Sequence, residues 1–297
     1  MASPTTAPPA RRRLLLVHAH PDDETLATGG TIARYAADPD TSVTLVTCTL
    51  GEQGEVIPAG LAMLVAEQAD QLGGYRIGQL AGACAALGLT DHRFLGGVGR
   101  WRDSGMVLAG HGVRAATPER LHPRALARPE AFAEQVDALV EVLAEVRPQV
   151  VVTYAADGGY GHPDHVRAHQ ITVAALARVP ARLACTVVSR SALDAGVARL
   201  AALSGLPHRL PAPGELPGVD DAGIAVRLDV TAQRAARVAA LRAHATQVEV
   251  WDDGAVDGPV AWVLSNGVAQ PLLDVEEFVL PDGPAGPLDD LFAGVAP

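Results

Sequence analysis

Short apolar runs alternate with amphipathic stretches along most of the chain. The runs rich in aliphatic or β-branched residues predict buried strands over 14–17, 42–49, 92–95, 150–154 and 183–189. Between them, helical spacing of apolar residues predicts helices over about 24–37, 62–72, 77–88, 130–146 and 165–178. Strands that alternate with helices in this way form βαβ units. We therefore expect an α/β fold, with a mostly parallel sheet and helices on both faces.

The alternation stops at residues 205–223, which are rich in Pro and Gly. Beyond them, the pattern predicts one helix over 232–244 and strands over 261–264 and 278–280. We interpret 14–204 as the main domain and 205–285 as a smaller C-terminal α+β subdomain. Residues 1–13 are expected to form a disordered tail, and 286–297 a second tail.

Composition narrows the possible functions. Hydrophobic residues make up 48% of the chain and charged residues 19%, which is typical of a globular protein. A net charge of −11 disfavours sequence-independent binding to nucleic acid. All 23 basic residues are arginine, which excludes a lysine Schiff base and a Walker A loop. No segment is apolar for long enough to predict a membrane span, and three widely spaced cysteines suit a reducing cytoplasm, where we expect the protein.

Two clusters of histidine and aspartate follow predicted strands. His20-Pro21-Asp22-Asp23-Glu24 comes directly after the first strand, and Gly161-His162-Pro163-Asp164-His165 comes just beyond the strand at 150–154. Ligands of parallel sheets bind at the carboxyl ends of the strands, near a switch in strand order, so the clusters can meet. Either aspartate of the first cluster could serve only as a helix cap. Histidine and aspartate together in both loops nevertheless favour a metal site.

Imidazole and carboxylate ligands without thiolate suit a catalytic zinc or iron site. Three protein ligands would leave room for a water, whose pKa a metal ion lowers to about 7. A further carboxylate could accept the proton of this water, and a further histidine could stabilise charge on a tetrahedral intermediate. Such a set of groups predicts metal-assisted hydrolysis of an amide or ester.

The paired motifs AHPDDE and HPDH resemble those of the LmbE-like (PIG-L) zinc deacetylases, which act on N-acetylglucosamine conjugates. The segments TCTLGEQGEVI, ADQLGGYRIG, LGGVGRWRDSGM, GGYGHPDH and AHATQV extend the resemblance over about residues 14–280. They are most similar to the branch that deacetylates N-acetylglucosaminyl-inositol in mycothiol biosynthesis. The resemblance implies a Rossmann-like fold, one Zn²⁺ (or Fe²⁺) per subunit and a small amino-sugar–inositol substrate.

The resemblance also implies roles for individual residues. The metal ligands would be His20, Asp23 and His165, and Asp22 would be the general base.

Five further residues would complete catalysis or bind substrate. His162 would stabilise the oxyanion and protonate the departing amine, and Tyr160 would polarise the substrate carbonyl. Asp164 would tune the neighbouring histidine. Arg76 and Asp103 would contact the sugar–inositol substrate. The sequence departs from the family pattern around residues 107–128 and 251–260. The resemblance therefore does not identify the residues that contact the outer part of the substrate.

Three alternatives remain at this point. An amidase of the same family that cleaves mycothiol S-conjugates would share the metal site. A nucleotide-binding α/β module would need a glycine-rich loop after the first strand, where HAHPDDE stands instead. The pair Gly29-Gly30 falls inside a predicted helix, which favours close packing over phosphate binding. A family member without activity is disfavoured because every expected metal and base residue is present.

Overall fold

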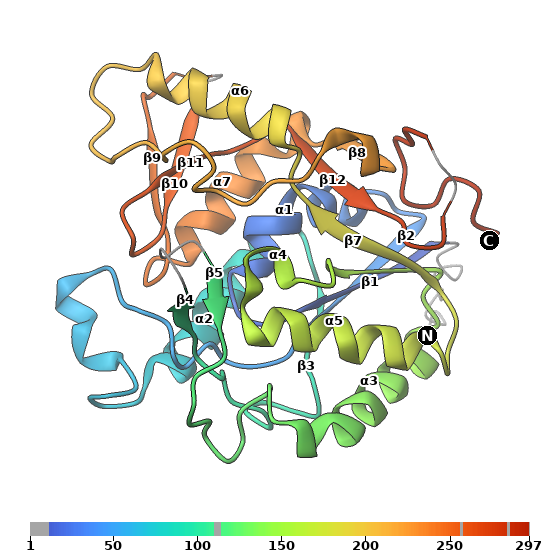
Figure 1. Cartoon of the computed structure of the whole chain (residues 1–297). Coiled ribbons are helices and arrows are strands. Elements are labelled where there is room, and N and C mark those ends of the chain that lie inside the picture. Colours follow the sequence, from blue (N-terminus) through green and yellow to red (C-terminus); the bar gives the residue numbers. More distant parts are fainter. Residues whose placement is uncertain (1–11, 110–113, 256–257, 284–285, 297) are drawn as a thin grey trace, which may run out of the picture.

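A computed structural model describes residues 12–109, 114–255, 258–283 and 286–296. A seven-stranded sheet forms the centre of the protein (Figure 1). The strand order is β3-β2-β1-β6-β7-β12-β8. The strands from β3 to β7 are parallel, β12 joins antiparallel to β7, and β8 pairs antiparallel with β12. These strands span Arg12–His18 (β1), Thr41–Thr47 (β2), Asp91–Phe94 (β3), Val150–Tyr154 (β6), Arg182–Val187 (β7), Val226–Asp229 (β8) and Val275–Val279 (β12). The expected mostly parallel α/β sheet is confirmed.

Helices cover both faces of this sheet (Figure 1). Alternate residues of β1 point to opposite faces: Leu14 and Leu16 pack in one apolar core with α1, α2 and α7, whereas Leu15 and Val17 pack in the other with α3 and α5. The helices span Asp23–Ala36 (α1), Leu72–Ala86 (α2), Phe132–Val146 (α3), Gly158–Gly161 (α4), Pro163–Leu176 (α5), Arg190–Ala201 (α6) and Arg234–Ala243 (α7). Within the described residues, no helix has the length and apolar character that a membrane crossing requires.

The C-terminal part of the chain contributes to two sheets. Glu249–Asp252 (β9), Val260–Val263 (β10) and Ala269–Pro271 (β11) form a separate antiparallel sheet of three strands. However, β8, β12 and α7 also come from 205–285, and they extend the main sheet or pack on it. The segment that was interpreted as a subdomain therefore shares its core with the rest of the protein. A short hairpin of Val107–Ala109 (β4) and Arg114–Ala116 (β5) completes the strands of the described residues.

Two expectations about irregular segments need correction. Residues 286–296 are not a tail, because Leu288 pairs with Ala225 and Val226 at the β8 edge and Leu291 is fully buried in the core. Of the expected N-terminal tail, 1–11 lie outside the described residues, and Arg12 and Arg13 already belong to β1.

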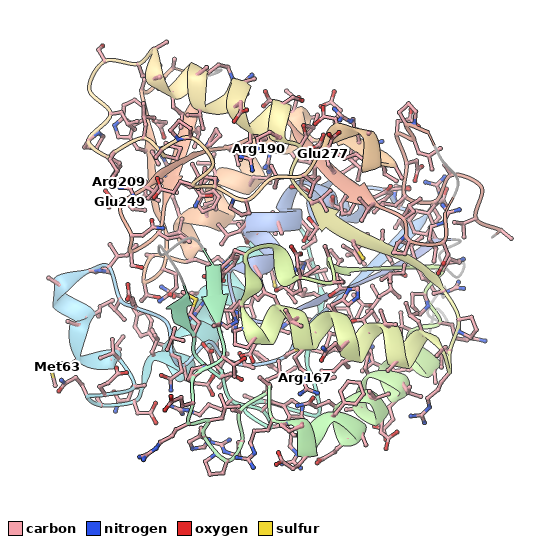
Figure 2. The ribbon with its side chains drawn as sticks, in the orientation of Figure 1. Met63, Arg167, Arg190, Arg209, Glu249 and Glu277 are labelled. Atoms are coloured by element: carbon pink, nitrogen blue, oxygen red, sulfur yellow. The ribbon has the colours of Figure 1, made fainter. Side chains whose placement is uncertain are left out.

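The predicted helix over 62–72 is also wrong. A 3-10 helix, Ala59–Leu64, is followed by turns, and α2 begins only at Leu72. None of the residues in that 3-10 helix is buried, and Met63, which is 65% exposed, projects from the edge of the molecule (Figure 2). The alanine- and leucine-rich pattern had no apolar surface to pack against, and helices of this length depend on such packing.

Helix α1 contains a kink that brings it close to the C-terminal region. Thr28 has non-helical dihedral angles, and the amides of Gly30 and Thr31 beyond it donate to the carboxylate of Glu276 at 2.7 Å each. A Cβ at Gly30 would lie 2.5 Å from Cβ of Val230. Gly30 therefore lets α1 pack closely against Val230, and the close packing predicted for this glycine is confirmed.

Candidate active site and metal centre

The two histidine–aspartate clusters meet at the carboxyl ends of β1 and β6. These adjacent strands form the switch point of the sheet, because the chain proceeds from β1 to β2 and β3 on one side and to β6 and β7 on the other. The carboxylate of Asp23 lies between two imidazoles, with Oδ2 3.2 Å from Nδ1 of His20 and Oδ1 3.3 Å from Nε2 of His165. Nitrogen atoms of His20, His162 and His165 all lie within 4.8 Å of one another. The structure thus brings His20, Asp23 and His165, the three expected ligands, close together, with His162 beside them.

The ring of His165 is oriented as a metal ligand would be. Its Nδ1 lies 3.2 Å from the carbonyl oxygen of Gly158, an acceptor that fixes the proton on Nδ1. Its Nε2 is buried, makes no hydrogen bond and faces Oδ1 of Asp23 at 3.3 Å, so a lone pair points toward the cluster. Tyr154, the last residue of β6, stacks on this ring at 4.1 Å between centroids. The residues present therefore fit a metal ion bound by nitrogen and oxygen donors.

Two carboxylates lie near Nε2 of His20, whereas Asp23 lies near Nδ1. Its Nε2 lies 3.3 Å from Oδ2 of Asp164 and 3.5 Å from Oδ1 of Asp103. Burial by itself would lower the pKa of His20, but the carboxylates of Asp103, Asp164 and Asp23 together raise it well above the usual value. A histidine that binds metal through one nitrogen commonly donates the other N–H to a carboxylate. Asp164, expected to tune a neighbouring histidine, thus contacts His20 with its carboxylate.

Asp22 occupies the N-cap position of α1, yet its side chain makes no capping hydrogen bond, so a capping role for it is excluded. Its φ of 123° is rare for a residue with a side chain and costs of order 1–3 kcal/mol. The carboxylate lies 2.9 Å from a guanidinium nitrogen of Arg76. Burial raises the pKa of Asp22 to about 6, with Arg76 opposing the rise and Asp23 adding to it. A carboxylate with such a pKa suits a general base near neutral pH.

The backbone fixes the tautomer of His162. Its Nδ1 accepts a hydrogen bond of 3.2 Å from the amide of Asp164 at the start of α5, so the proton of the neutral ring is on Nε2. Burial lowers the pKa of His162 to about 2, and the neighbouring His20 and His165 contribute to the shift. The neutral ring can donate one hydrogen bond through Nε2, and the site disfavours a second proton.

Tyr160 belongs to the short helix α4, whose other residues are all glycines. Gly158, Gly159 and Gly161 all have positive φ, between 68° and 92°, and allow the chain to turn sharply between β6 and α5. The Tyr160 ring lies edge-on to His165, with centroids 5.2 Å apart. Burial raises the pKa of Tyr160, so its hydroxyl remains a hydrogen-bond donor.

The two expected substrate contacts, Arg76 and Asp103, border the cluster and are 2% and 4% exposed. Besides Asp22, the Arg76 guanidinium donates to the carbonyl oxygens of Gly51, at 2.8 Å, and Pro21. The carboxylate of Asp103 accepts from the amides of two residues, Gln53 and Gly105, at 3.2 and 2.8 Å. Both side chains therefore also hold the loops that surround the histidine–aspartate cluster.

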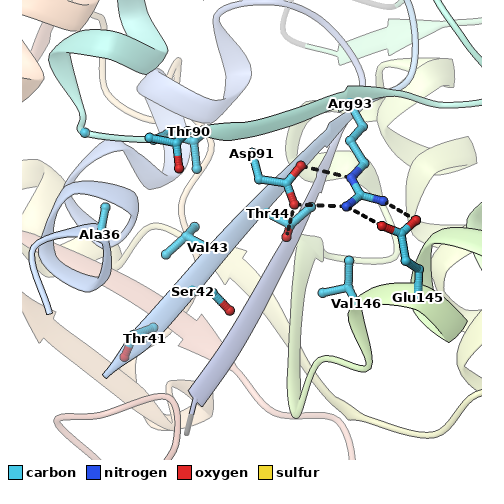
Figure 3. Close-up of a pocket in the computed structure, with 12 residues that line it drawn as sticks. Ala36, Thr41, Ser42, Val43, Thr44, Thr90, Asp91, Arg93, Glu145 and Val146 are labelled. Carbon is cyan, nitrogen blue, oxygen red and sulfur yellow. Dashed lines mark hydrogen bonds and ion pairs between the residues drawn. The ribbon is translucent and has the colours of Figure 1, made fainter. Parts of the chain in front are cut away.

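A hollow of about 360 Å³ lies elsewhere, at the amino ends of β2 and β3. Its charged side chains pair with one another: Arg93 donates to Asp91 and to Glu145 (Figure 3). No histidine is among its lining residues. It has none of the chemistry of the cluster at the opposite ends of the strands.

Comparison with known proteins agrees with this geometry. Residues 15–176 match the family model described as PIG-L, GlcNAc-PI de-N-acetylase. The chain belongs to the PIG-L family. It is 59% identical over 293 residues to an Actinosynnema mirum protein named 1D-myo-inositol 2-acetamido-2-deoxy-alpha-D-glucopyranoside deacetylase, and the match covers 98% of each chain. A Saccharopolyspora erythraea protein with that name and the suffix 1 is 58% identical over 297 residues, covering 98% of this chain and 95% of the relative.

A solved structure shares the PIG-L fold. It is the crystal structure of a deacetylase–teicoplanin complex from teicoplanin biosynthesis. The TM-score is 0.51 at 20% sequence identity, and the match covers 91% of this chain and 99% of that one.

Sequence analysis missed several residues of the PIG-L site. Tyr154 stacks on His165, and its hydroxyl accepts a hydrogen bond of 2.8 Å from the amide of Ala19. Its place as the last residue of a predicted strand, next to the loop, could have indicated this role. Glu24 and His244 form a buried pair behind the cluster. No spacing in the sequence connects His244 to the site.

Proposed function

We propose that this protein is a metal-dependent N-deacetylase that releases acetate from 1D-myo-inositol 2-acetamido-2-deoxy-α-D-glucopyranoside. The observation that carries the proposal is the convergence of His20, Asp23 and His165 at the switch point of the sheet. The substrate is supported by the names of the two relatives at 59% and 58% identity, which match the chain over nearly its full length.

His20, Asp23 and His165 would hold one Zn²⁺ or Fe²⁺ per subunit. Two imidazoles and a carboxylate accept either metal, and the support of His20 by Asp164 is typical of catalytic metal sites. When bound, the ion would lower the pKa of a water molecule toward neutrality and polarise the amide carbonyl.

Asp22 would accept the proton of the attacking water. Its carboxylate is not engaged as a helix cap and is held by Arg76 beside the cluster. Its elevated pKa makes it a stronger base than an ordinary aspartate.

His162 and Tyr160 would stabilise the oxyanion that forms as the carbonyl is attacked. Nε2–H of His162 and the hydroxyl of Tyr160 are donors in a buried, preorganised site. Protonation of the departing amine by His162 would need a doubly protonated ring, which the Asp164 amide and burial disfavour. The proton accepted by Asp22 is the more accessible source for the amine.

Arg76 and Asp103 would bind hydroxyl groups of the sugar–inositol substrate at the border of the metal cluster. Both side chains carry full charges and contact residues of the site, Asp22 and His20 respectively. This proposal requires that the substrate reach between the loops that they hold.

The decisive experiment measures metal content and acetate release together. The purified protein is analysed for zinc and iron, stripped with a chelator, and assayed on the inositol substrate after each metal is restored. We expect activity to disappear with the metal and to return with Zn²⁺ or Fe²⁺. A fully metal-loaded protein that released no acetate, but cleaved a mycothiol S-conjugate, would instead identify an amidase.

A further inference from the structure

A buried hydrogen bond between His244 and Glu24 joins the C-terminal region to the start of α1, next to the loop that carries Asp22. Nε2 of His244, at the end of α7, lies 2.7 Å from Oε1 of Glu24 in the first turn of α1. Both side chains are fully buried, although 220 residues separate them in the sequence. Because an ionised carboxylate can only accept, the proton of this hydrogen bond belongs to Nε2 of His244.

The other oxygen of the same carboxylate holds Asp22. Oε2 of Glu24 accepts the amide N–H of Asp22 at 2.9 Å. This is the residue with φ of 123°, a backbone conformation that neighbouring contacts must maintain. The hydroxyl of Thr25 donates to Oε1 at 2.5 Å and further restricts the carboxylate. His244, Glu24 and Asp22 thus form a continuous chain of hydrogen bonds.

A second buried pair, between α7 and β12, provides a comparison. Arg237 of α7 lies 3.6 Å from Glu276, whose carboxylate accepts the amides of Gly30 and Thr31 in the distal half of α1. That pair fastens α7 and β12 to α1 without contacting Asp22. The Arg237–Glu276 pair therefore already holds α7 against α1. What distinguishes the Glu24–His244 pair is its hydrogen bond to Asp22 in the loop after β1.

We propose that His244 and Glu24 act as positioning residues that fix the backbone of Asp22, and with it the direction of the Asp22 carboxylate. The inference rests on the proposed role of Asp22 as general base. Without the hydrogen bond from His244, only Thr25 and the Asp22 amide itself restrain the Glu24 carboxylate, and the strained amide of Asp22 loses a firmly fixed acceptor. A base displaced by about 1 Å from its productive geometry can lose roughly 100-fold in rate.

The test compares four variants by kcat, KM, metal content and thermal midpoint. His244→Ala should lower kcat roughly 10- to 100-fold while KM changes less than about twofold and metal content stays at the wild-type level. His244→Gln, whose amide nitrogen reaches about as far as Nε2, should recover most of kcat. His244→Asn, which is one carbon shorter, should not. The Gln and Asn variants keep a polar group at the position, so their comparison carries the test even if His244→Ala does not fold.

Arg237→Met is the matched control, because it removes a buried charge from the same helix without touching the loop. It should lower the thermal midpoint and leave kcat unchanged. If His244→Ala and Arg237→Met lose stability alike and both keep kcat, or if the Gln and Asn variants have equal kcat, the positioning role is wrong. Failure of the underlying function has a different signature: Asp22→Asn would then retain near-normal kcat.

Discussion

The guanidinium of Arg76 lies 2.9 Å from the carboxylate of Asp22, and both groups are buried beside the metal cluster. Arg76 is part of α2, whereas Asp22 follows β1, so this contact links helix α2 to the loop after β1. The positive charge favours the ionised form of Asp22, and burial disfavours it. The balance between these two effects sets the basicity of the proposed general base.

Replacing Asp22 by asparagine should separate catalysis from metal binding. Asp22→Asn is nearly isosteric and leaves the three ligands in place, so metal content should remain at one equivalent. General-base catalysis is worth roughly 10²–10⁴-fold, and kcat should fall by about that factor. Steady-state kinetics with metal analysis of the same sample checks both quantities. Loss of the metal would instead identify Asp22 as a ligand.

Arg76→Met should move the acidic limb of the kcat/KM profile to higher pH. Removing the cation leaves the effect of burial unopposed, so the pKa of Asp22 rises and the base is protonated at a higher pH. Arg76→Lys keeps a positive charge and should move the limb less. A pH series from acidic to neutral with the three proteins tests this. An unchanged limb in Arg76→Met would mean that Asp22 does not control it.

Asp103→Ala tests the proposed substrate contact. Loss of a hydrogen-bonded partner should cost roughly 1–3 kcal/mol in transition-state binding on the sugar–inositol substrate, and less on a simple N-acetylated sugar. The kcat/KM values on the two substrates give the comparison, and Arg76→Ala should behave similarly. Equal losses on both substrates would show that these residues act through His20 and Asp22, which they contact.

His162→Ala should lower kcat by roughly 10²–10³-fold, the usual effect of removing one oxyanion donor. Metal content should be unchanged, because His162 is not among the three proposed ligands. If His162 were the proton donor to the amine, the wild-type protein would show a basic limb that this variant lacks. We expect the basic side of the two profiles to match.

Each of the variants His20→Ala, Asp23→Ala and His165→Ala should lose metal and activity together. Each removes one of three ligands, and the buried donors that remain would hold the ion far more weakly. Metal analysis after dialysis, compared with acetate release, measures the two losses. Three variants that each kept a full equivalent of metal would contradict the proposed coordination.

The sequence by itself determined the sheet and the meeting of the two histidine–aspartate clusters. Runs such as 14–17 and 150–152 are apolar throughout because the parallel strands to which they belong are covered on both faces. Since parallel strands end at the same edge of a sheet, His20 and His165 were expected to meet despite the distance between them in the chain. Local pattern and topology were sufficient here, because each cluster follows closely after its strand.

Tertiary structure alone decided the contacts that surround this cluster. The pairs Arg76–Asp22 and His244–Glu24 join elements that no periodicity relates, and their partners are selected by how α2 and α7 pack on the sheet. The same limit explains why the sequence pattern predicts a helix over 62–72 and a tail over 286–297. Whether an apolar residue such as Met63 or Leu291 is exposed or buried depends on what surface lies opposite it, and only the assembled fold supplies that surface.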